Sequence, residues 1–170
     1  MCEPASMIIV KSGKVYWSQS SESHEDIIAE FNLEHLDTMR DVQLVRMEIT
    51  PPDRDLRKPL EEWRFKVDQD MLPDWWWAGW AEELVRQELT SWLTAKVVLT
   101  NQEVKEVTGN LLAVYGTVQE VWDGGTVQEV YGGGTVIAYT KLDPSILKHP
   151  NAVLVDRSGE TVQVFAGKED

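Results

Sequence analysis

The chain has 170 residues, a net charge of −13, 42% hydrophobic residues and a single cysteine, Cys2. One cysteine excludes an internal disulfide, and the acidic balance disfavours direct binding to nucleic acid, which requires clustered Lys and Arg. No apolar run approaches the ~18 residues that a membrane span needs. Residues 1–14 also lack the pattern of a signal peptide, so we expect a globular cytoplasmic protein that does not contact a membrane.

The N-terminal part begins with hairpin and helix signals. Residues 7–17 contain two short apolar runs around a Ser-Gly pair, which indicates a β-hairpin. Ser23 is a suitable N-cap for a short helix that ends near Asn32, and Asp26 follows three residues later in a capping-box arrangement.

Two further strands are predicted before a long helix. Residues 42–49, VQLVRMEI, are predicted to form a partly two-sided strand, because the apolar alternation slips near Val45. The proline pair at 51–52 ends that strand. Residues 62–67 alternate apolar and charged side chains, which is typical of a half-buried strand.

A helix is predicted from about Trp75 to Lys96, with Asp74 as its N-cap. Its start holds a cluster of tryptophans: Trp75, Trp76, Trp77 and Trp80. Three consecutive helical residues fan out by about 100° each, so at least one of these rings is exposed or covers another element. The cluster is either structural packing or a binding surface for a protein, a sugar or a nucleobase.

The C-terminal part contains an internal repeat. From Gly116 the sequence reads GTVQEVWDG, GTVQEVYGG and GTVIAY, a nine-residue unit stated twice and begun again. Pairs of apolar residues three positions apart continue this pattern toward the N-terminus. The first members of successive pairs are separated by seven, seven, nine and nine residues. The pairs are Val104 and Val107, Leu111 and Val114, Val118 and Val121, Val127 and Val130, and Val136 and Tyr139.

Two β architectures fit this repeat. The Asp-Gly and Gly-Gly turns suit an antiparallel meander. However, two valines separated by two polar residues both point inward only if the strand bends between them. That spacing favours a β-solenoid in which each unit forms one face of a coil.

Stacking of the two nine-residue units would align Gln119 with Gln128, Glu120 with Glu129, and Trp122 with Tyr131. Such a ladder of glutamates and aromatic rings is a candidate protein-binding face. The simpler interpretation is that the two rings stack on each other as structural aromatics.

The overall fold expected is therefore α+β. A small α+β module over residues 1–96 carries the Trp-rich helix, a short Val- and Gly-rich solenoid spans 97–142, and 143–170 form a C-terminal cap and hairpin. A short solenoid leaves an open end with unpaired backbone groups. The cap covers that end, or a second subunit does, which predicts a homo-oligomer.

Other motifs indicate no chemistry. No histidine stands at metal-ligand spacing with another histidine or with the cysteine, so we expect neither a metal nor a cofactor. His24 is best explained by its place in the first turn of a capped helix. Two pairs of loop carboxylates are expected to be solvated: Asp53 with Asp55, and Asp68 with Asp70.

Four segments carry a resemblance to other proteins: ESHEDIIAEFN at 22–32, WRFKVDQDMLPDWW at 63–76, the GGTVQEVYGGGTV repeats, and AVLVDRSGE at 152–160. They resemble a group of uncharacterised bacterial and bacteriophage proteins with a small N-terminal module and a variable number of GGTVQ-type repeats. The resemblance implies this architecture and a phage-linked setting in the host cytoplasm, and it supplies no catalytic residues. This chain has fewer clear repeats than many members.

The sequence predicts a non-enzymatic, phage-type accessory protein that binds another protein. An acidic inhibitor of a host defence or nucleic-acid-processing complex would suit the net charge. The alternative is a ligand-binding module that uses the tryptophan cluster. An enzyme is the third hypothesis, and it lacks a coherent set of catalytic residues.

Overall fold

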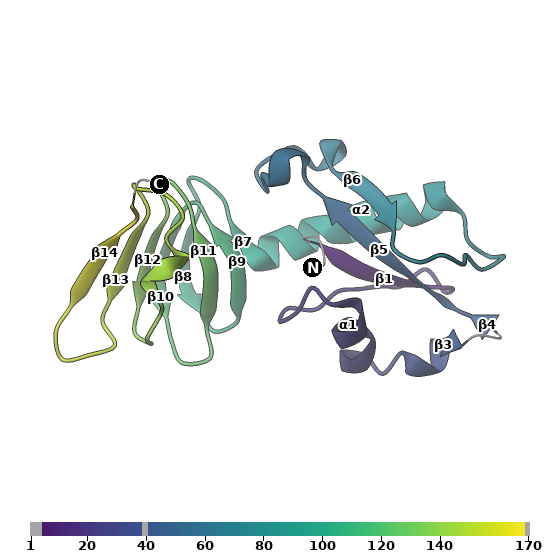
Figure 1. Cartoon of the computed structure of the whole chain (residues 1–170), viewed down its shortest axis with the longest axis horizontal. Helices are drawn as coiled ribbons and strands as arrows, with labels where there is room; N and C mark the ends of the chain where they lie inside the picture. The colour runs from purple at the N-terminus through teal and green to yellow at the C-terminus, as the bar shows by residue number, and fades with distance from the viewer. Residues whose placement is uncertain (1–4, 39–40, 169–170) are drawn as a thin grey trace. The chain divides into compact units, whose positions relative to one another are not determined.

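The computed structural model describes residues 5–38 and 41–168, and the chain forms two compact units, Met1–Leu93 and Thr94–Asp170 (Figure 1). Cys2 and the last two residues of the predicted polar tail lie outside the described residues. The fold class is α+β with a C-terminal β-solenoid of about 4 turns, as predicted. None of the described helices is long and apolar enough to cross a membrane.

The N-terminal unit is built on an antiparallel sheet with the strand order β2-β1-β5-β6. The predicted hairpin is confirmed, because β1 pairs with β2. The predicted 42–49 strand divides, since residue 42 belongs to a separate short hairpin of β3 and β4. The strands are β1 (Ser6–Val10), β2 (Val15–Tyr16), β3 (Asp37–Thr38), β4 (Asp41–Val42), β5 (Leu44–Thr50) and β6 (Arg64–Val67).

Both faces of this sheet are covered, because every residue of β1 is buried. On one face, Ile8 packs in a cluster with Ile27 and Ile28 of α1 (His24–Glu30). Ser23 caps α1 as predicted, and its hydroxyl accepts a hydrogen bond from the Asp26 N–H at 3.4 Å.

The longer helix, α2 (Ala78–Lys96), buries one stripe of side chains. Ala81, Val85, Leu89 and Trp92 are fully buried at spacings of four, four and three residues, which is one face of a helix. Arg86 ties α2 to the segment before β6 by donating hydrogen bonds to the carbonyl oxygens of Leu60 and Trp63 at 2.6 and 3.1 Å. Short 3-10 turns complete this unit: η1 (Glu34–Leu36), η2 (Pro52–Arg54) and η3 (Leu60–Glu62).

The predicted start of the long helix is wrong. The helix begins at Ala78, and its first hydrogen bond runs from the Ala81 N–H to the Trp77 carbonyl at 3.1 Å. A turn precedes it, in which the Trp76 N–H donates to the Pro73 carbonyl at 2.9 Å. Asp74 is therefore not an N-cap, and the three consecutive tryptophans lie before the helix.

The C-terminal unit is a two-faced parallel solenoid. One sheet has the order β14-β13-β12-β10-β8 and the other has the order β11-β9-β7, so the strands from β7 to β12 alternate between the two faces. The elements are β7 (Val97–Val98), β8 (Glu103–Val107), β9 (Asn110–Val114), β10 (Thr117–Val121), β11 (Thr126–Val130), β12 (Thr135–Ala138), η4 (Pro144–Ile146), β13 (Val153–Asp156) and β14 (Gln163–Ala166).

The valine pairs fill the solenoid core as expected. Val118 and Val121 of β10 are both fully buried, and the two side chains between them point away from the core. Val127 and Val130 of β11 repeat this arrangement from the opposite sheet. The antiparallel meander is therefore excluded, because β8, β10, β12 and β13 pair in parallel.

The last pair departs from the prediction. In β12 the core residue after Val136 is Ala138, which is fully buried, and the register shifts between Val118 and Val121. Tyr139, predicted as the second core residue, lies just outside the strand. This irregularity turns its ring to the outside of the coil.

The predicted stacking of adjacent repeat units is wrong. Thr117 aligns with Thr135, which is 18 residues away, and not with Thr126. Because each nine-residue unit is one face of a coil, the next unit lies on the other face. Three predicted alignments therefore do not occur: Gln119 with Gln128, Glu120 with Glu129, and Trp122 with Tyr131.

Glycines before the repeated threonines allow the coils to pack closely. A Cβ added at Gly134 would lie 2.5 Å from the Val114 carbonyl oxygen and 2.8 Å from a methyl group of Val130. Gly125 has the same relation to the Val107 carbonyl, also at 2.5 Å. The repeat therefore requires glycine here for space and not only for turn geometry.

Candidate functional site

The tryptophan cluster lies on the segment that leads into α2. The Trp75 indole N–H donates a hydrogen bond to the Val42 carbonyl at 3.0 Å, which fixes the segment against β4. The Trp75 ring meets Trp76 and Trp80 edge-on, with centroid separations of 6.3 and 6.2 Å. Trp80 also packs against the hairpin turn, since its ring lies 3.2 Å from the Cβ position of Gly13. These three rings are half-buried packing elements.

Trp77 differs from the other three tryptophans, because 69% of it is exposed. Met71 and Leu72, which begin the same segment, are 67% and 48% exposed. We call residues 71–77 the docking segment. It presents three large apolar side chains to solvent from an irregular stretch anchored by Trp75. Exposed tryptophan and methionine are enriched at protein interfaces.

A shallow hollow of about 470 Å³ lies beside the docking segment. Its surroundings are acidic, since Asp41 and Asp74 line it and Asp70 precedes Met71. The one basic residue among the hollow's lining residues is Lys11. The surface therefore combines exposed apolar side chains with a negative rim.

The solenoid carries two aromatic ladders, each at positions just after successive strands. In the first, the ring of Trp122 stacks on Tyr139 at 4.4 Å, and the Arg157 guanidinium lies 5.9 Å from the centre of the Tyr139 ring. In the second, Tyr115 stacks on Tyr131 at 4.8 Å. Lys148 occupies the next coil position of the second ladder, because its N–H donates to the Val130 carbonyl. Arg157 thus ends the first ladder, and Lys148 holds the corresponding backbone position in the second.

The predicted site residues of the solenoid are brought together in pairs, one pair in each ladder. The Trp122 indole N–H donates to the Glu120 carboxylate at 3.1 Å, and the Tyr131 hydroxyl donates to the Glu129 carboxylate. Because their strands belong to different sheets, the four residues do not form one face. These residues have a structural role, because each carboxylate accepts a hydrogen bond from an aromatic side chain of the same ladder.

Removing one ring tests this structural role. Trp122→Ala should lower the free energy of unfolding of the solenoid by about 1 kcal/mol, because it deletes the stack on Tyr139. Trp122→Phe keeps an aromatic face and should lose less. Urea unfolding followed by circular dichroism measures both variants, and equal losses would show that stacking is not the cause.

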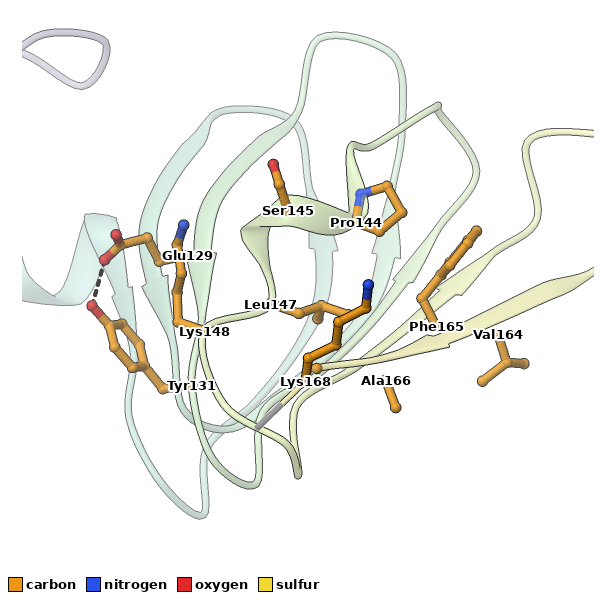
Figure 2. A pocket seen from close by; sticks show the side chains of 11 residues that line it. Glu129, Tyr131, Pro144, Ser145, Leu147, Lys148, Val164, Phe165, Ala166 and Lys168 are labelled. Atoms are coloured by element: carbon orange, nitrogen blue, oxygen red, sulfur yellow. Dashed lines mark hydrogen bonds between the residues drawn. The ribbon is translucent and has the colours of Figure 1, made fainter. Parts of the chain in front are cut away.

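A groove of about 1000 Å³ lies at the C-terminal end of the solenoid (Figure 2). Glu129 and Tyr131, two predicted site residues, lie on one side of it, and the segment before β13 contributes Leu147 and Lys148. Residues 164–168 form the other side. The lining is mixed, with apolar side chains between charged ones.

Groups with shifted pKa values lie on strands β5 and β6 and in surface turns. On the strands, the pKa of Arg46 is raised chiefly by its hydrogen bond to Asp37, and the pKa of Lys66 is raised chiefly by its hydrogen bond to Glu48. The pKa of Asp55 is lowered chiefly by its hydrogen bond from the Arg57 side chain, and the pKa of Asp156 is lowered by hydrogen bonds from Ser158.

His24 is buried beneath the sheet, and its Nε2 lies 3.0 Å from the Met47 carbonyl oxygen. Its Nδ1 lies 3.6 Å from the Asp68 carboxylate. These contacts favour a structural role for the ring. Among the described residues, no group of three or more His, Cys, Asp or Glu side chains could hold a metal ion.

Sequence reasoning missed Met71 and Leu72. The available signal was their position before Pro73, outside any periodic element. It also missed Phe165 and Lys168 in the groove, and no motif marked them. Comparison with protein-family models, curated proteins and solved structures finds no match to this chain.

Proposed function

We propose that this chain is a non-enzymatic binding module that docks a partner protein onto the docking segment, residues 71–77. The exposure of Trp77, at 69%, is the observation that carries the proposal. Residues so exposed do not contribute to the core, and Trp is the residue most enriched at binding hot spots.

The proposed partner has an apolar pocket surrounded by basic residues. Its pocket would receive Trp77, while its basic rim would meet Asp70 and Asp74. The net charge of −13 would speed encounter with such a partner. Proteins that process nucleic acid carry surfaces of this kind, so a phage-type inhibitor of a host defence or nucleic-acid-processing complex fits the proposal.

A small-molecule site is the second candidate, and the hollow beside Trp75 is the observation that favours it. Ring stacking of a sugar or nucleobase requires an open aromatic face. Trp75 meets both of its tryptophan neighbours edge-on and is half-buried, whereas Trp77 does not line the hollow. This geometry supports protein docking over ligand stacking. Quenching or shift of tryptophan emission by a small ligand would reverse that preference.

Trp77→Ala should weaken capture of the partner at least about tenfold, as expected for a hot-spot residue. The immobilised chain is incubated with bacterial lysate at low and moderate salt, and bound proteins are quantified by mass spectrometry. Trp122→Ala is the matched control, because it removes a 42% exposed tryptophan from the other unit.

The expected result is a salt-sensitive protein that is lost with Trp77→Ala and retained with Trp122→Ala. A double variant, Met71→Ser with Leu72→Ser, should reproduce the loss. The proposal fails if capture is the same for wild type and Trp77→Ala, or if no salt-sensitive partner binds.

A further inference from the structure

The second unit ends in an edge strand. β14 pairs with β13 and is the last strand of its sheet, with no strand on its other side among residues 5–38 and 41–168. The Gly167 N–H donates to the Ala152 carbonyl at 3.0 Å. Hydrogen-bonding direction alternates along an antiparallel strand. The N–H and C=O groups of Val162, Val164 and Ala166 therefore point away from β13.

This edge lacks the features that normally prevent strands from pairing with another chain. Residues 161–166, TVQVFA, contain no charge and no proline. Val162 is 60% exposed and Val164 is 67% exposed. Native edge strands are usually protected by lysine, proline or a bulge, so an unprotected apolar edge indicates a pairing site.

The outer face of the sheet also becomes apolar toward β14. The strand register places Ile137, Val155 and Val164 in one row across β12, β13 and β14. The outward residues of the other two strands of that sheet are polar or charged, such as Gln119 of β10 and Lys105 of β8. The apolar strip is thus confined to the end that carries the free edge.

Charges at the two ends of the edge are complementary. Glu160 precedes β14 and Lys168 follows it, and both are exposed. In an antiparallel pairing of two identical edges, the Glu160 end of one copy meets the Lys168 end of the other. A second copy of this chain would therefore pair with the free backbone groups, bury the exposed valines and place Glu160 beside Lys168.

We propose that two copies of the chain dimerise through β14, with a two-fold axis passing beside Val164. In this register Val164 faces its own counterpart, Val162 faces Ala166 of the second copy, and Lys168 lies beside Glu160 of the second copy. The three facing pairs supply roughly six backbone hydrogen bonds across the seam. The two five-stranded sheets become one continuous sheet, and the interface is isologous and closed.

This interface involves only the second unit and does not depend on the docking segment. The strand is short and the buried area is small, so the dissociation constant is expected to be on the order of 10 µM. The neutral sequence of the edge lets two chains of like net charge approach there.

Sedimentation velocity of the full chain over a concentration series tests the dimer. Val164→Lys should raise the dissociation constant about tenfold or more, because it places two lysines face to face at the axis. Gln128→Lys on exposed β11 makes a similar charge change away from the edge and should leave dimerisation unchanged. Circular dichroism confirms that each variant is folded.

Two further measurements test the register. In a Cys2→Ser background, Val164→Cys should form an intermolecular disulfide readily, because facing Cα atoms in this pairing lie about 5.5 Å apart. Ala166→Cys should form it slowly. Lys168→Glu should weaken the dimer, and adding Glu160→Lys should restore it.

A monomer at the highest concentration reached, or a dimer unaffected by Val164→Lys, overturns the proposal. Faster cross-linking through Ala166→Cys than through Val164→Cys also overturns it, because the axis would then lie elsewhere.

Discussion

Replacing Gly134 by alanine should destabilise the solenoid by about 3 kcal/mol, a large effect for the addition of one methyl group. The added Cβ would lie 2.5 Å from the Val114 carbonyl oxygen and 2.9 Å from that of Tyr131. The Val114 oxygen belongs to the backbone of the neighbouring coil, so relief of that contact requires the coils to move apart. Because the same strands hold Val130 and Val114 in the core, their separation would also loosen apolar packing.

Two other glycines serve as controls for Gly134→Ala. Gly159→Ala should be close to neutral, since nothing lies within 4 Å of its Cβ position. Gly133→Ala should cost about 1 kcal/mol, because its φ of +86° is unfavourable for alanine although the space is open.

Hydrogen–deuterium exchange of peptides from residue 94 onward separates the solenoid signal from that of the first unit. Exchange should accelerate throughout the solenoid with Gly134→Ala. If Gly134→Ala and Gly159→Ala exchange alike, close approach of the coils does not explain the glycine.

The second large effect is expected at Trp63. Trp63→Ala should lower the free energy of unfolding of the first unit by about 4 kcal/mol, because it removes a large side chain that is only 2% exposed. The ring packs edge-on against Trp92 with a centroid separation of 6.3 Å. Its indole N–H also donates to the Lys58 carbonyl at 3.0 Å, so the substitution leaves that acceptor without its present donor.

Trp77→Ala is the matched control for Trp63→Ala, since it deletes an identical side chain that is 69% exposed. Its effect on stability should remain within about 0.5 kcal/mol. Urea unfolding followed by tryptophan fluorescence measures both, because seven of the eight tryptophans precede residue 94. A large loss with Trp77→Ala would mean that this side chain supports the fold, and the docking proposal would lose its main support.

The solenoid could be predicted because its core has a strict spacing. Apolar pairs stepping by seven, seven, nine and nine residues imply coils of 14, 16 and 18 residues when two steps make one turn. The register has these lengths, in the pairs Val104 with Val118, Leu111 with Val127, and Val118 with Val136. The same steps place adjacent units on opposite faces of the coil. The similarity of the two units nevertheless predicts direct stacking, which is wrong because a full turn contains two units.

The start of α2 could not be predicted from local signals. Asp74 is a good cap by residue type, and the tryptophans continue the apolar pattern of the helix. The deciding contact is the hydrogen bond from Trp75 to the Val42 carbonyl, which joins residues 33 positions apart. A tertiary contact of this kind overrides local propensity, and it explains why the chain does not become helical at Trp75 although the local sequence predicts a helix there.

The candidate sites were predictable only in part. The sequence marked Trp77 within a cluster but could not distinguish it from its three packed neighbours, because exposure depends on the turn before α2. It marked Glu129 and Tyr131 as surface residues, yet the groove beside them is formed by β14 and the 144–148 segment. The sequence predicted an open end of the solenoid, covered by the 143–170 segment or by a second subunit. That this segment itself ends in the edge strand β14 could be known only from the strand order.

Because the strands of the repeat alternate between two sheets, it matters whether the number of nine-residue units is odd or even. Inserting or deleting a single nine-residue unit would move every later strand to the opposite sheet and carry the closing hairpin with it. Inserting or deleting two units would change the length of the stack by one full turn and leave each strand on its own side. Growth of such a chain by duplication should therefore favour even numbers of units, with an odd number tolerated only where the hairpin can close the stack from the other side.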